Sequence, residues 1–229
     1  RGKLYPSDSP ISNGKIEIKY MTAKEEDILT SQNLIKKGIV ITKLLDSLIL
    51  TEGITSSDLV MGDKNAVMVA ARVLAYGPQY TCEVPNPATG DTVKRTFDLT
   101  DCPFKKLPSD IDGNDFTFAL PISKNKIRFK LLTGKEELLI DEELKNINKS
   151  VGGQVSPELT TRLRHLITEV DGNNEQSYIN TFAQNMLARD SMALRQEIKR
   201  ISPDIDLTQE IEMGGEVGSV TIPMTTTFF

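Results

Sequence analysis

The stretch from Asp206 to Met224, DLTQEIEMGGEVGSVTIPM, decides how the carboxyl-terminal part of the chain folds. Two runs that contain β-branched residues flank a pair of glycines, Gly214 and Gly215. This pattern predicts two strands joined by a tight turn, because glycine tolerates the backbone conformations that a hairpin turn requires. The stretch Gln79–Leu99 has the same strand, turn, strand pattern further upstream. We therefore expect two β-hairpins.

Both hairpins lack the residues that would bind a zinc ion. Zinc-ribbon hairpins are closed by four ligands in tetrahedral geometry, with a C-x-x-C pair in the turn. The turn from Met213 to Glu216 contains no cysteine, and the upstream hairpin contains only Cys82. One thiol cannot form a tetrahedral site. The sequence therefore predicts two metal-free, ribbon-like hairpins and no cofactor.

A metal-free hairpin needs another source of stability. A structural zinc ion contributes on the order of 10 kcal/mol to the folding of a small ribbon, and an isolated two-stranded hairpin is marginal in water. We expect both hairpins to pack against the body of the protein or against another chain. The predicted partner-binding residues of the carboxyl-terminal segment are Ile211, Val217, Val220, Ile222, Met224, Phe228 and Phe229.

Several segments of the chain, taken in order, resemble one protein family. They are Met21–Thr30, Asn33–Gly38, Ile127–Gly134, Leu163–Asn173, Tyr178–Ile179, Met186–Ser191, Leu194–Arg195 and Phe228–Phe229. They are similar to segments of the baseplate hub proteins of T-even-type contractile-tailed phages, and together they span nearly the whole chain. Several members of that family carry paired cysteines in both hairpins. This chain departs from that pattern, which removes the zinc sites and keeps the fold.

The resemblance implies a function without catalysis. It implies a structural component of the baseplate hub that acts in baseplate assembly through contacts with other hub and tail proteins, in several copies. The expected location is the virion tail, with the host cytoplasm during assembly. A transient assembly factor that is absent from the mature virion is the alternative. A metal-dependent enzyme is a third possibility, which convergence of Asp110, Asp112 and an acidic helix in a deep pocket would favour.

Composition excludes other classes of function. The 229 residues include 27 basic and 32 acidic side chains, a net charge of -5, whereas nucleic-acid binding by counterion release needs a concentrated basic surface. No apolar run approaches the roughly 20 residues that span a bilayer. We expect neither a nucleic acid nor a membrane as partner. Cys82 and Cys102 fit reduced thiols better than a disulfide.

Candidate catalytic and metal-binding motifs are weak. His165 falls on the polar side of a predicted helix, where we expect an exposed pair with Glu169, four residues further on. Asp110–Asp115 has glycine at the fourth position, whereas a calcium-binding EF-hand loop needs it at the sixth. Gly214–Gly218 precedes a strand rather than a helix, so it does not match a phosphate-binding loop. We expect no enzymatic activity.

The periodicity of apolar residues predicts an α+β fold, a helical body with small antiparallel β elements. The predicted segments are 1–14, an extended arm; 15–78, a strand and helices; 79–133, a β-ribbon and a strand pair; 134–205, helices; and 206–229, a hairpin and tail.

Local signals predict where individual elements begin and end. Alternation predicts a strand at Ile16–Tyr20. Asp63 and Asp190 are predicted to cap the helices that follow them, because a carboxylate can accept hydrogen bonds from the first free backbone N–H groups. A further helix is predicted to start after Ser156, with Pro157 at its first position, and to end at Asp171.

Overall fold

The computed structural model describes residues 2–86, 88–151, 156–213, 215–224 and 228–229. The chain forms two compact units. Unit 1 consists of Arg1–Lys15, Ser57–Met61 and Leu107–Ser202, and unit 2 consists of Ile16–Ser56, Gly62–Lys106 and Pro203–Phe229. The α+β class predicted from the sequence is confirmed, since helices and small antiparallel sheets make up both units. The five predicted segments do not correspond to these units, because each unit consists of stretches that lie far apart in the sequence.

Unit 1 contains a three-stranded antiparallel sheet. Its strands are β3 (Phe116–Ala119), β4 (Lys126–Phe129) and β5 (Ile167–Val170), with β4 in the centre. Phe129 and Ile127 of β4 and Val170 of β5 are fully buried. The strands are short, so the helices on the sheet supply most of the buried area.

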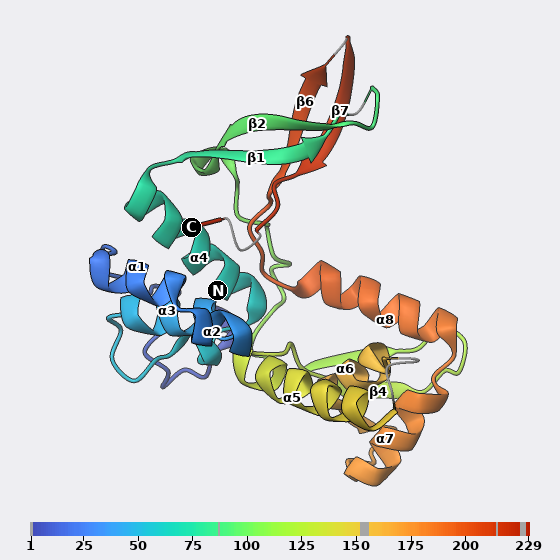
Figure 1. Ribbon diagram of the computed structural model, residues 1–229. Helices are drawn as coiled ribbons and strands as arrows, with labels where there is room; N and C mark the ends of the chain where they lie inside the picture. The colour runs from blue at the N-terminus through green and yellow to red at the C-terminus, as the bar shows by residue number, and fades with distance from the viewer. Residues whose placement is uncertain (1, 87, 152–155, 214, 225–227) are drawn as a thin grey trace. The chain divides into compact units, whose positions relative to one another are not determined.

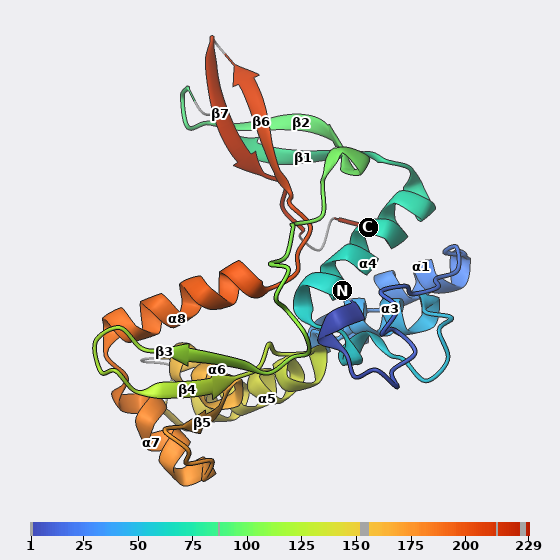
Figure 2. The ribbon, with the colours of Figure 1, turned by 180° about the vertical axis from the view of Figure 1, so that it is seen from behind.

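The helices of unit 1 complete its apolar core. They are α5 (Gly134–Val151), α6 (Glu158–Leu166), α7 (Gln176–Asn185) and α8 (Ala188–Ile201). Figures 1 and 2 show α5 and α6 on one side of the sheet. Leu163 of α6, Ile179 of α7 and Leu194 of α8 meet the buried strand residues in one cluster.

The first fourteen residues are not the predicted extended arm. After a 3₁₀ turn at Gly2–Leu4 the described backbone follows consecutive turns, with hydrogen bonds from Tyr5 to Gly2 and from Gly14 to Ile11. Leu4 and Ile11 are buried. The proline, serine and glycine residues do form irregular backbone. The segment is not extended, however, because Leu4 and Ile11 are buried in unit 1.

Unit 2 combines short helices with both hairpins. Its helices are α1 (Ala23–Thr30), α2 (Gln32–Lys37), α3 (Val40–Leu48) and α4 (Met61–Tyr76), the last from Gly62 onward. A short 3₁₀ turn lies at Leu99–Asp101, and another, Ser56–Asp58, lies where the chain passes from unit 2 to unit 1. The hairpin strands are β1 (Gln79–Pro85), β2 (Thr92–Asp98), β6 (Thr208–Met213) and β7 (Glu216–Thr221). Both predicted hairpins are confirmed, with antiparallel registers that pair Gln79 with Asp98 and Thr208 with Thr221.

One glycine is required where α4 begins. A Cβ atom at Gly62 would lie 1.6 Å from the carbonyl oxygen of Pro203. The chain that leads into β6 therefore passes directly over the first turn of α4, and any side chain at position 62 would displace it.

Three predicted element boundaries are wrong. Ile16–Tyr20 forms only an isolated bridge, between Ile18 and Ile49, because the pairing does not continue to neighbouring residues. Asp63 was predicted to cap α4 from outside, but α4 begins at Met61, so Asp63 lies within its first turn. The helix predicted to run to Asp171 begins after Pro157, at Glu158, and ends at Leu166, since Ile167–Val170 pairs with β4 instead. Sheet pairing has overridden a helical pattern there.

Asp190 is also used differently from the prediction. It lies inside α8, whose flanking residue is Leu187, and its side chain is fully buried. One carboxylate oxygen accepts a hydrogen bond from the Ile122 backbone N–H (2.8 Å) and the other accepts one from Ser123 (3.0 Å). Burial works to raise the pKa of Asp190, but these bonds outweigh it and hold the pKa below its usual value. Asp190 therefore fastens the turn between β3 and β4 to α8.

We predict that Asp190→Ala destabilises unit 1 by about 2 kcal/mol, because two backbone donors lose a charged acceptor. Hydrogen exchange at the Ile122 and Ser123 amides measures the effect locally, and urea unfolding measures it globally. Asp190→Asn keeps one acceptor and should lose less. Equal losses in the two variants would show that packing, and not the hydrogen bonds, holds the turn.

One capping arrangement occurs twice, once in each unit. The sequences KYMTAKEE (19–26) and KLLTGKEE (130–137) share the pattern K-x-x-T-x-K-E-E. In the first, the Glu25 carboxylate accepts bonds from the Thr22 backbone N–H (2.9 Å) and hydroxyl (2.6 Å), and binds Lys19 (2.7 Å). The carboxylate thus closes the first turn of α1 and ties it to the preceding segment.

In the second copy, Glu136 makes the same contacts at the start of α5. It accepts a bond from the Thr133 backbone N–H (2.9 Å) and one from the Thr133 hydroxyl, and it binds Lys130 at 2.6 Å. Hydrogen bonds, above all from Lys19, lower the pKa of Glu25 to about 2. Burial opposes the shift at Glu136, but Lys130 and Thr133 outweigh it and lower that pKa to about 2 as well.

These pKa values predict acid-labile helix starts. Because both carboxyls bind protons more weakly in the folded chain, their contribution to stability is present above about pH 4.5 and is lost as the pH falls towards 2. Urea midpoints measured across that range should fall, and should fall less steeply in Glu25→Gln and Glu136→Gln. Glu83→Gln, at an exposed site on β1, is the matched control. Identical pH profiles for all variants would contradict the prediction.

No helix among the described residues is long and apolar enough to cross a membrane.

Candidate functional site

The two hairpins stabilise each other through a shared apolar core. Tyr80 and Val84 of β1, Phe97 of β2 and Val220 of β7 are buried in one cluster, which Ile222 joins. β7 contacts β1 directly, and Figure 1 shows the β6–β7 hairpin lying across β1 and β2. Of the two sources of stability that the sequence left open, the structure uses packing against the body of the same unit. Each hairpin therefore buries apolar side chains of the other.

Most of the predicted partner-binding residues are engaged inside unit 2. Val220, Ile222 and Phe228 are buried, whereas Val217 is 67% exposed. The remaining three, Ile211, Met224 and Phe229, are partly buried against the same core. Val217 is thus the one residue of the predicted set whose side chain is left largely open to solvent.

Arg72 of α4 holds the Phe228–Phe229 segment. Its Nε atom donates to the carbonyl oxygen of Phe228 at 2.7 Å. The same guanidinium lies over the rings of Tyr76 and Tyr80, at 4.9 and 5.7 Å from their centroids. The Phe228 ring packs edge-on against Tyr80, with 5.0 Å between centroids. Cation–π and aromatic contacts add to apolar burial here, and the sequence carried no signal that α4 would receive this segment.

We predict that Phe228→Ala destabilises unit 2 by roughly 3–5 kcal/mol, because it leaves a cavity beside Tyr80. Val217→Ala should change stability by less than about 0.5 kcal/mol, since the side chain is exposed. Thermal unfolding followed by near-ultraviolet circular dichroism of the tyrosines measures both. A small loss for Phe228→Ala would mean that the segment contributes little to the core.

Unit 1 contains a pocket of about 560 Å³. Charged side chains of α5 and α6 line it, together with Lys130, which directly follows β4: they are Lys130, Glu136, Glu143, Arg164 and His165. Amide side chains in and just before α7, three apolar residues and one threonine complete the wall: Asn174, Gln176, Asn180, Leu139, Ile167, Ile179 and Thr168.

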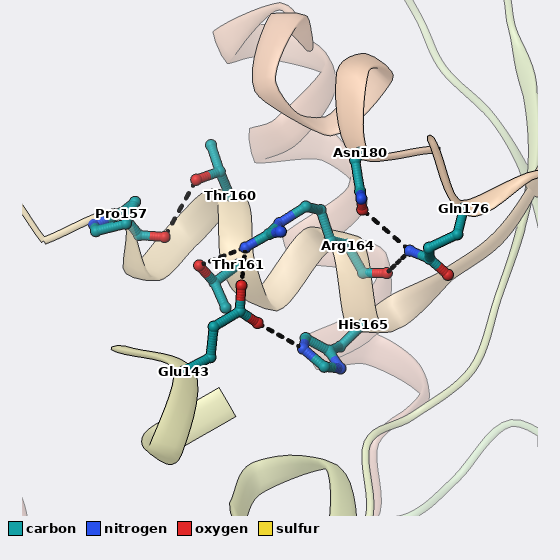
Figure 3. Close-up of polar contacts among 8 residues, drawn as sticks. All are labelled: Glu143, Pro157, Thr160, Thr161, Arg164, His165, Gln176 and Asn180. Atoms are coloured by element: carbon teal, nitrogen blue, oxygen red, sulfur yellow. Dashed lines mark hydrogen bonds and ion pairs between the residues drawn. The ribbon is translucent and has the colours of Figure 1, made fainter. Parts of the chain in front are cut away.

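Glu143 of α5 organises the polar side of this pocket. Figure 3 shows its two carboxylate oxygens bound to different residues of α6: Oε1 lies 2.6 Å from Nη2 of Arg164, and Oε2 lies 3.1 Å from Nε2 of His165. Arg164 also donates to the Thr161 hydroxyl at 3.1 Å. Partial burial works to raise the pKa of Glu143, but the bonds from His165 and Arg164 outweigh it and keep the pKa below its usual value.

The predicted pair between His165 and Glu169 is wrong. The helical spacing on which it rested ends at Leu166, so Glu169 lies on β5, where it binds Arg128 of β4 at 3.3 Å. His165 is instead partly covered and faces α5. The contact with Glu143 joins two helices across 22 residues of sequence, so no helical or strand periodicity could predict it.

The pocket geometry does not assemble a familiar hydrolytic site. Glu143 could orient His165 as a general base, yet neither serine nor cysteine occurs among the lining residues of the described chain. The two carboxylates face Lys130 and Arg164, so the charges balance in pairs. The arrangement is a network of ion pairs and hydrogen bonds that joins α5 to α6, and a second such contact links Glu137 to Arg162 at 2.7 Å.

The other sequence candidates have structural partners. Asn114, within the Asp110–Asp115 stretch, exchanges two hydrogen bonds with the backbone of Leu131, and Asp115 pairs with Arg128. Within the described residues, no group of three histidine, cysteine, aspartate or glutamate side chains is placed to hold a metal ion. Cys82 and Cys102 are both buried free thiols, as the sequence predicted, and burial raises the pKa of each.

Comparisons with protein-family models, with curated proteins and with solved structures find no match to this chain.

Proposed function

We propose that this protein is a structural component of a contractile phage tail baseplate hub, acting through contacts with other hub and tail proteins. The observation that carries the proposal is the order of the segments that resemble the hub family, from Met21–Thr30 to Phe228–Phe229. A transient assembly factor that leaves before the virion matures is the alternative within the same class.

The chemistry of the described residues supports a binding role over a catalytic one. A metal-dependent enzyme would be favoured if Asp110, Asp112 and an acidic helix converged in a deep pocket. Neither aspartate lines the pocket of unit 1. That pocket is bounded instead by paired charges.

Quantitative mass spectrometry of purified mature virions tests the proposal. A structural hub subunit should be present in several copies per particle. Presence in baseplate precursors combined with absence from virions would favour the assembly factor. Absence from both would overturn the proposal.

A further inference from the structure

The outer face of α8 carries a pattern that the fold does not explain. Residues three, four and seven positions apart share one face of an α-helix. Met192 is therefore flanked by Arg189 on one side and by Arg195, Gln196 and Lys199 on the other. All five side chains are exposed, and Met192 is 50% exposed. We call these five residues the α8 face.

The opposite side of α8 accounts for the stability of the helix. Leu194, Ile198 and Ile201 pack into the core of unit 1, and Asp190 fastens the neighbouring turn. The α8 face is not required for any of these contacts. Because these contacts fix the position of the helix, its backbone need not be ordered when a partner binds, which lowers the entropy cost of binding.

The charge of the α8 face has one sign. The acidic residues of α8 lie elsewhere: Asp190 is buried, and Glu197 binds Arg200 through two contacts of 2.7 and 2.8 Å. Among the residues described, no carboxylate lies within ion-pairing distance of Arg189 or Arg195; Arg195 donates only to a backbone carbonyl, that of Ser191. A cationic face on a chain of net charge -5 is a local feature and not a consequence of composition.

The combination of an apolar centre with a cationic rim indicates a protein partner. Interfaces are enriched in methionine and arginine, with apolar side chains at the centre and charges at the rim. Methionine is flexible and adapts to different apolar surfaces. We propose that the α8 face docks an acidic amphipathic helix of another protein, whose apolar stripe covers Met192 and whose carboxylates pair with Arg189 and Arg195.

Titration of the full chain with designed peptides tests the proposal. The probe is a helical peptide with a leucine stripe flanked by glutamates, followed by amide chemical-shift changes. We expect shifts along Arg189–Lys199 and affinity that falls with added salt. The double variant R189E/R195E should bind about tenfold more weakly, and Met192→Gln should also weaken binding.

The matched control reverses two exposed lysines of another helix. K36E/K37E, at the end of α2, changes the net charge by the same amount and should leave binding unchanged. Circular dichroism confirms that the variants are folded. An equal loss in K36E/K37E, no binding of the leucine peptide, or equal binding of a glutamate peptide without leucines would each overturn the proposal.

Two further results would assign the α8 face to another occupant and so overturn the proposal. Tighter binding of a duplex DNA oligonucleotide, lost in R189E/R195E, would make it a nucleic-acid surface. Self-association of the unmodified chain that R189E/R195E abolishes would make it a contact between two copies.

Discussion

Both units depend on a carboxylate that closes the first turn of a helix and binds a lysine three residues before the cap. In unit 2 Glu25 joins Lys19 and Thr22, and in unit 1 Glu136 joins Lys130 and Thr133. A helix start leaves backbone donors without partners, and the capping carboxylate satisfies one of them. The lysine adds a second constraint, since it fixes the direction in which the preceding segment enters. Short helices such as α1 are marginal alone, so this entry angle determines which face they can pack.

The second constraint on the fold is the apolar core that the two hairpins share. Four thiolates would have held each turn closed independently of its surroundings. The sequence places no such ligand set in either hairpin, and the β1–β2 and β6–β7 hairpins each provide apolar side chains to one core instead. That shared core explains why the stretch from Pro203 to Phe229 belongs to unit 2, although the residues just before it belong to unit 1. It also explains the burial of residues that the sequence assigned to a partner, such as Val220 and Ile222.

The sequence could predict what local patterns determine. Glycines between β-branched runs located both hairpins, and apolar periodicity located the helices. It could not predict contacts that join distant segments. The residues around Asp190 do not show whether its carboxylate caps its own helix or accepts hydrogen bonds from a turn 67 residues away, because backbone N–H groups are the donors in both cases. Likewise, Ile167–Val170 continues a helical apolar pattern, and only the presence of β4 beside it makes a strand more favourable. The contact between Glu143 and His165 was missed for the same reason.

Four helices precede each hairpin along the chain: α1 to α4 come before β1–β2, and α5 to α8 come before β6–β7. The two sets differ in that β5 lies between α6 and α7, whereas no named strand of the described chain interrupts α1 to α4. The long helix before the first hairpin, α4, is covered: Arg72 binds the carbonyl of Phe228 and lies over Tyr80. The corresponding helix of the second set, α8, lies in unit 1, whereas the hairpin that follows it lies in unit 2. Among the described residues, Arg189 and Arg195 of α8 make no contact of the kind that Arg72 makes with Phe228 and Tyr80. Their side chains and that of Met192 are exposed, so α8 has an apolar and cationic face open to solvent.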